Sequence, residues 1–113
     1  MAQLRTIFFD KVDRNCPLNE YPRPQFERDF WVNLNGKFDY AITDANSTFP
    51  QKYDGEILVP FAIESELSGV EKHITKDDRL WYRKNFEITE EFKDKRAIIN
   101  FGAVDWECLQ VPC

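Results

Sequence analysis

The sequence predicts an all-β protein folded as an antiparallel β-sandwich. Short runs rich in β-branched and aromatic residues recur along the chain, and turn-forming residues separate them. Only one segment has apolar residues at helical spacing, and it contains a glycine near its middle. The 113 residues suffice for one domain with a buried core. They are too few for a (β/α)8 barrel, which needs at least about 200 residues.

The first predicted element is a β-hairpin. Two alternating, aromatic-rich runs, residues 30–34 and 37–42, flank the dipeptide Asn35-Gly36. Both residues of this dipeptide tolerate the positive φ of a type I′ turn, whose twist matches that of the strands on either side. Alternation places three side chains on one face of the second strand: Phe38, Tyr40 and Ile42.

A loop and a short buried strand are expected next. Residues 44–55 are polar and contain proline and glycine, which predicts a loop. The run 57–59 predicts a buried strand that ends at Pro60, because proline has no N–H to donate to a ladder. Apolar residues within 63–74 recur at helical spacing, but Gly69 disfavours a helix there. We therefore expect a loop with one helical turn.

The last third of the chain predicts further strands. Residues 80–88 alternate, and Lys84 is the one polar residue on their apolar face. Residues 96–101 are dense in β-branched and aromatic residues and are followed by Gly102. Alternation resumes over residues 104–108. About five short strands with turns between them favour two packed sheets.

Charge and composition exclude several kinds of partner. The formal net charge is −5, and no run of lysine or arginine exceeds a pair, so we expect no nucleic-acid binding. No stretch approaches the roughly 20 apolar residues that span a bilayer, so we expect no membrane partner. Because no signal peptide is recognisable, the cytoplasm is the default location. With three scattered cysteines and one histidine, we expect neither a metal site nor a cofactor.

Four sequence motifs give the chain a family resemblance. They are YPRPQFERDFWVNLNG (21–36), GEILVPFAIESELSGV (55–70), LWYRKNF (80–86) and NFGAVDWE (100–107). In order and spacing they resemble the opening of glycoside hydrolase family 2 enzymes. Any one motif would be weak, but four in register cover most of the chain.

The resemblance implies a domain and a role. It implies an amino-terminal arm, residues 1–20, followed over residues 21–113 by a jelly-roll, galactose-binding-domain-like, sugar-binding domain. Members of the family are retaining exo-glycosidases of the β-galactosidase, β-glucuronidase or β-mannosidase kind, with two catalytic glutamates in a separate barrel. No residue of this sequence corresponds to either glutamate. We therefore expect no catalytic residue, and hydrolysis of O-glycosidic bonds only within a complete enzyme.

The carboxyl end departs from the family pattern, which continues with a strand, an Asn-Gly turn and more strands. Here the chain ends at Cys113, so we expect an incomplete jelly roll with exposed strand edges and poor solubility. The expected partners are a β-glycoside and the remaining domains of the enzyme. Two alternatives stay open: a free, non-catalytic carbohydrate-binding module and a nonfunctional gene fragment.

Three neighbouring residues are the candidate sugar contacts. In the family, the loop after the 57–59 strand borders the substrate pocket, so Glu64, Ser65 and Glu66 would hydrogen-bond to sugar hydroxyls. The alternative is a solvated loop that packs on the barrel domain. Three tryptophans could also stack on a sugar, although burial in the core is the favoured interpretation: Trp31, Trp81 and Trp106.

Overall fold

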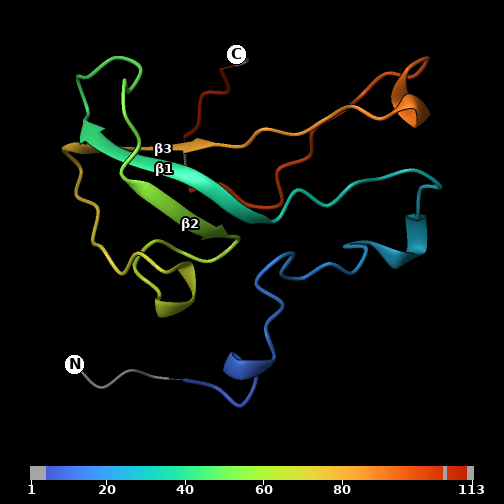
Figure 1. The fold of residues 1–113 in the computed structure, drawn as a ribbon, viewed down its shortest axis with the longest axis horizontal. Coiled ribbons are helices and arrows are strands. Elements are labelled where there is room, and N and C mark those ends of the chain that lie inside the picture. The colour runs from blue at the N-terminus through green and yellow to red at the C-terminus, as the bar shows by residue number, and fades with distance from the viewer. Residues whose placement is uncertain (1–4, 106, 112–113) are drawn as a thin grey trace.

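A three-stranded antiparallel sheet organises the chain in the computed structural model, which describes residues 5–105 and 107–111. The strands are β1 (Gly36–Asp44), β2 (Gly55–Val59) and β3 (Asp78–Arg83). Their order across the sheet is β2-β1-β3, so β1 is the central strand (Figure 1). The described residues are thus mainly strand and loop, and the predicted all-β class is confirmed.

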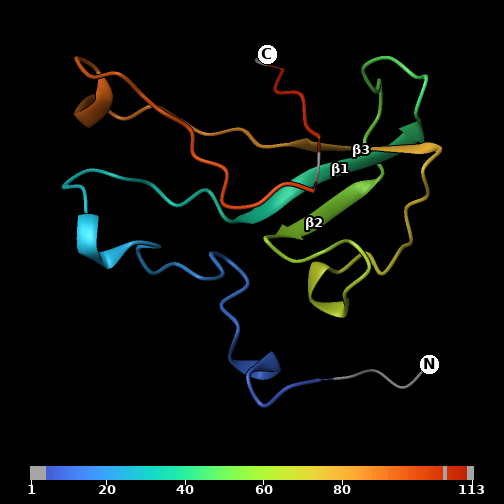
Figure 2. The same ribbon diagram turned by 180° about the vertical axis from the view of Figure 1, so that it is seen from behind.

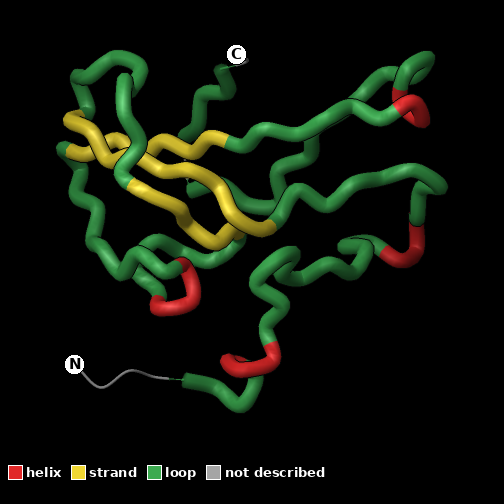
Figure 3. Tube along the Cα trace, viewed as in Figure 1, coloured by secondary structure: helices red, strands yellow, loops and turns green. Residues whose placement is uncertain are grey.

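Short 3-10 helices lie in the long loops outside the sheet (Figure 3). Each has three residues, and they are η1 (Phe9–Lys11), η2 (Pro24–Phe26), η3 (Glu66–Ser68) and η4 (Glu90–Phe92). Within the described ranges, no helix is long and apolar enough to cross a membrane.

The core lies on one face of the sheet. Tyr40, Ile57 and Ile63 are its buried residues. In the register, Phe38 of β1 lies opposite Ile57 of β2, and Tyr40 lies opposite Tyr82 of β3. Partly buried side chains from all three strands and from the loop after β2 pack around these residues: Phe38, Ile42, Val59, Val70, Ile74 and Leu80. The predicted common face of β1 is therefore confirmed.

The predicted hairpin at Asn35-Gly36 is wrong. Gly36 begins β1, and residues 30–34 form no strand. The Asn35 side-chain amide donates to the Pro17 carbonyl oxygen at 2.9 Å, so it binds the amino-terminal arm instead of closing a turn. Gly36 has φ 127°, and a Cβ there would lie 2.5 Å from the Asn15 carbonyl oxygen. Glycine is thus needed for close backbone approach.

The prediction for the β2 region is confirmed. Residues 45–54 connect β1 to β2, and β2 ends at Val59, immediately before Pro60. The helical spacing within 63–74 yields only the single turn η3, as expected. The apolar residues of the segment 63–74 pack against the core instead, because the loop folds back beneath β2 (Figure 1).

The later strand predictions fail in part. β3 ends at Arg83, five residues before the predicted end, and the Lys84 side chain donates to the Lys37 carbonyl oxygen at 3.0 Å. Residues 96–101 form no strand, nor do the described members of 104–108. Both long edges of β1 are already occupied by β2 and β3, so these segments have no place beside the central strand. The described residues contain one sheet, seen from behind in Figure 2, and the predicted second layer is not found among them.

The packing of Ile57 generates the first prediction. Ile57 is 1% exposed, so Ile57→Ala removes buried methyl groups and leaves a cavity. We expect this variant to lower the free energy of unfolding by about 2–5 kcal/mol in urea denaturation. The matched control is Ile7→Ala, at a position 81% exposed, where we expect a change within about 0.5 kcal/mol. Equal effects of the two substitutions would contradict the assigned core.

Candidate functional site

The loop that follows β2 is held in shape by two serine hydroxyls. The Ser65 hydroxyl donates to the Ala62 carbonyl oxygen at 2.6 Å and accepts from the Ser68 N–H at 3.3 Å, so Ser65 caps η3. Ser68 is 2% exposed, and its hydroxyl donates to the Ser65 carbonyl oxygen at 2.7 Å and accepts from the Val70 N–H at 3.1 Å. Gly69 then ends the turn with φ 80°. These bonds fix the backbone that carries the candidate sugar contacts.

Glu66 binds the amino-terminal arm. Its carboxylate accepts two hydrogen bonds from the Arg5 guanidinium, one of them from Nε at 2.9 Å. This hydrogen-bonded pair raises the pKa of Arg5, because it stabilises the charged guanidinium. Arg5 also lies 4.5 Å from the centre of the Phe9 ring. Each oxygen of Glu66 therefore accepts one hydrogen bond from Arg5, which leaves fewer acceptor sites for a sugar hydroxyl.

Glu64 has a different environment. It is exposed, and its carboxylate has no hydrogen bond or ion pair with another described residue. Its charge nevertheless acts on Tyr82 of β3. Partial burial is the main cause that raises the pKa of the Tyr82 hydroxyl, and the negative charge of Glu64 raises it further. Glu64 is thus the candidate contact whose carboxylate is most accessible to a ligand.

The three candidate residues do not form one pocket. The Ser65 hydroxyl forms its hydrogen bonds within its own loop, and Glu66 binds the arm. The charge of Glu64 acts on Tyr82 of β3. With its donor and one lone pair committed, Ser65 retains a single lone pair for an outside donor. The three residues are consecutive in the sequence, but in the structure each makes different contacts.

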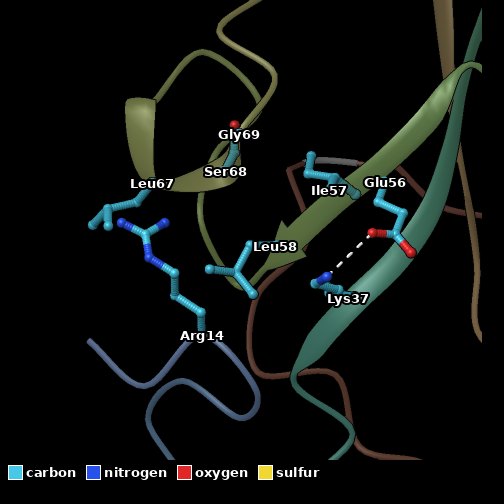
Figure 4. A pocket seen from close by; sticks show the side chains of 8 residues that line it. All are labelled: Arg14, Lys37, Glu56, Ile57, Leu58, Leu67, Ser68 and Gly69. Carbon is cyan, nitrogen blue, oxygen red and sulfur yellow. Dashed lines mark ion pairs between the residues drawn. The ribbon is translucent and has the colours of Figure 1, made fainter.

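A shallow hollow of about 190 Å³ lies beside this loop (Figure 4). Eight residues line it: Arg14, Lys37, Glu56, Ile57, Leu58, Leu67, Ser68 and Gly69. In Figure 4 the Arg14 guanidinium lies next to Leu67, and Lys37 pairs with Glu56 across the β1–β2 ladder at 3.4 Å. No sequence motif predicts this hollow, because its walls come from the arm, β1, β2 and η3, which are far apart in the chain.

The hollow combines charged rims with an apolar floor. Arg14 and Lys37 supply donors, Glu56 supplies acceptors, and Leu58 and Leu67 supply apolar surface. Such a combination suits a small ligand that carries both hydroxyl groups and C–H surface. Its volume is below the roughly 300–1,000 Å³ of ordinary ligand pockets, so it fits a small ligand or part of a larger one.

Trp81 and Trp31 each pack against another aromatic ring. The Trp81 indole N–H donates to the Thr43 hydroxyl at 2.8 Å, and its ring meets Phe49 edge-on at 5.5 Å. Trp31 is 37% exposed and meets the Tyr21 ring edge-on at 4.8 Å. Trp106 lies outside the described residues.

Neither a metal-binding cluster in the described part of the chain nor a similar known protein points to a function for this site. The described residues contain no group of three or more histidine, cysteine or acidic side chains that could hold a metal ion. No model of a known protein family and no curated protein matches the chain.

The environment of Tyr82 generates the second prediction. In alkaline titration followed by tyrosine absorbance, we expect Tyr82 to ionise above the ordinary value of 10.0, because burial disfavours the phenolate. Comparison with Tyr82→Phe isolates its signal. We expect Glu64→Gln to lower this pKa but leave it above the ordinary value, since burial is the larger cause.

The same shift has a consequence for stability. Because the folded-state pKa is raised, the neutral phenol stabilises the fold fully below about pH 10. This contribution is lost as the pH rises through the raised pKa. Between about pH 10 and the raised pKa, the melting temperature of Tyr82→Phe should therefore fall less than that of the parent chain in thermal unfolding. Identical losses in the two proteins would contradict the proposed burial of the phenol.

Proposed function

We propose that this chain is the amino-terminal sugar-binding domain of a glycoside hydrolase family 2 type enzyme. In this proposal it takes part in the hydrolysis of O-glycosidic bonds only together with the remaining domains. The observation that carries the proposal is the series of four motifs in order and register over residues 21–107. The chain itself would carry no catalytic residue, because nothing in it corresponds to the family's two glutamates.

The arrangement of the motifs around the sheet supports this proposal. The second motif, residues 55–70, comprises β2 and the hydrogen-bonded loop that follows it. The third motif, residues 80–86, begins within β3. An antiparallel sheet is also the kind of layer from which jelly rolls are built. We propose that β2, β1 and β3 form part of one layer of such a sandwich.

Glu64 is the residue best suited to hold a sugar. An exposed carboxylate can accept two hydroxyl hydrogen bonds, and bonds to a charged acceptor are stronger than neutral ones. Ser65 can add one accepted hydrogen bond, whereas the carboxylate of Glu66 is already shared with Arg5. None of these three residues lines the hollow beside η3, so the proposed sugar contact rests on the loop alone.

Binding and hydrolysis assays on the purified chain test the proposal. In titration calorimetry with methyl β-galactoside, β-glucuronide and β-mannoside, we expect binding of at least one sugar in the millimolar range. We expect Glu64→Gln to weaken this binding, because it removes the charged acceptor. Glu91→Gln on η4 is the matched control and should bind as the parent does, since η4 lies on a different loop (Figure 1).

Chromogenic β-glycosides complete the test. We expect the chain alone to hydrolyse none of them. Hydrolysis abolished by Glu64→Gln or Glu66→Gln would overturn the assignment of a non-catalytic domain. A folded chain that binds none of the sugars would contradict a sugar-binding role and favour the interpretation as a nonfunctional fragment.

A further inference from the structure

The outer edge of β3 has no strand beside it in the described part of the chain. The direction of its backbone groups follows from β1. The Ile42 N–H donates to the Asp54 carboxylate at 2.8 Å, and the Tyr40 carbonyl accepts from the Asp54 N–H at 2.8 Å. Both groups point to the β2 side, so Ala41 between them points to β3, where it faces Trp81.

Alternation then identifies the open groups on β3. Since Trp81 directs its N–H and C=O toward β1, its neighbours Leu80 and Tyr82 direct theirs outward. The Asp78 N–H, which also points outward, is bonded to the Thr75 carbonyl at 3.1 Å. The edge therefore offers the donors and acceptors of Leu80 and Tyr82 to an added strand.

A strand-forming segment of matching length lies elsewhere in the same chain. Residues 96–101 read RAIINF and number six, as many as β3. They form no strand, and their large apolar side chains are exposed: Ile98 is 64% exposed, Ile99 43% and Phe101 59%. A segment with high β-propensity that is exposed and unpaired readily adds to an open sheet edge.

We propose that residues 96–101 of a second copy of this chain add to the outer edge of β3 as an antiparallel strand. The alternating pattern places Ile99 and Phe101 on one face of the added strand. That face would extend the apolar face on which Leu80 and Tyr82 lie, and it would cover the half-exposed Tyr82 ring. Ile98 would lie on the face of Trp81.

A second copy fits this edge because each molecule carries both halves of the contact. Two copies related by a twofold axis would make the same pairing twice, and each would bury its own edge and its own segment. Each pairing would also give strand partners to the backbone of residues 96–101, which has none in the described chain. The proposal does not rest on sugar binding.

Sedimentation velocity over a wide range of protein concentration is the first experiment. We expect a monomer–dimer equilibrium, and we expect Ile99→Lys to raise the dissociation constant about tenfold or more. The matched control is Ile7→Lys, which changes an isoleucine that is 81% exposed in the amino-terminal arm and should leave the equilibrium unchanged. A monomer at every concentration, or equal effects of both substitutions, would overturn the proposal.

Disulfide trapping keeps the proposal testable if Ile99→Lys fails to fold. The three native cysteines are replaced by serine, and molecules carrying Tyr82→Cys are mixed and oxidised with molecules carrying Ile99→Cys. We expect a disulfide-linked heterodimer, and none when Leu18→Cys replaces Ile99→Cys. If the double variant Tyr82→Cys/Ile99→Cys instead forms its disulfide within one molecule at high dilution, the strand belongs to the same chain and the proposal is wrong.

Discussion

The pairing of β1 on both of its edges is the constraint on which the rest of the structure depends. β1 is the one described strand with two neighbours, and its residues pair with those of both β2 and β3. Tyr40, near its middle, is buried and lies opposite Gly55 on one side and Tyr82 on the other. The ring of Tyr40 leaves little room there, since a Cβ at Gly55 would lie 3.3 Å from it.

The loop after β2 takes its shape from the same core. Ile63 is 4% exposed and anchors the loop beneath the sheet, while serine hydroxyls satisfy the backbone groups of the turn at η3. Arg5 then ties the amino-terminal arm to this turn through Glu66. An anchored loop with an exposed Glu64 has a fixed geometry for a ligand, because its backbone need not be ordered on binding.

The two proposed contacts lie on different parts of the sheet. Sugar binding is assigned to the loop that leaves β2, whereas self-association is assigned to the outer edge of β3. β1 separates these two strands in the sheet. The negative charge of Glu64 also acts on Tyr82, so the pKa of Tyr82 is a probe of both regions.

The sequence by itself determined the local properties of the chain. Alternation set the apolar face of β1, Pro60 ended β2, and Gly69 limited the helical spacing of 63–74 to one turn, because each depends on neighbouring residues alone. The tertiary structure decided which segments pair. Asn35 bonds to Pro17 instead of turning a hairpin, and residues 96–101 stay unpaired despite their β-propensity. A strand needs a partner, and competition for the two edges of β1 is settled by contacts distant in sequence.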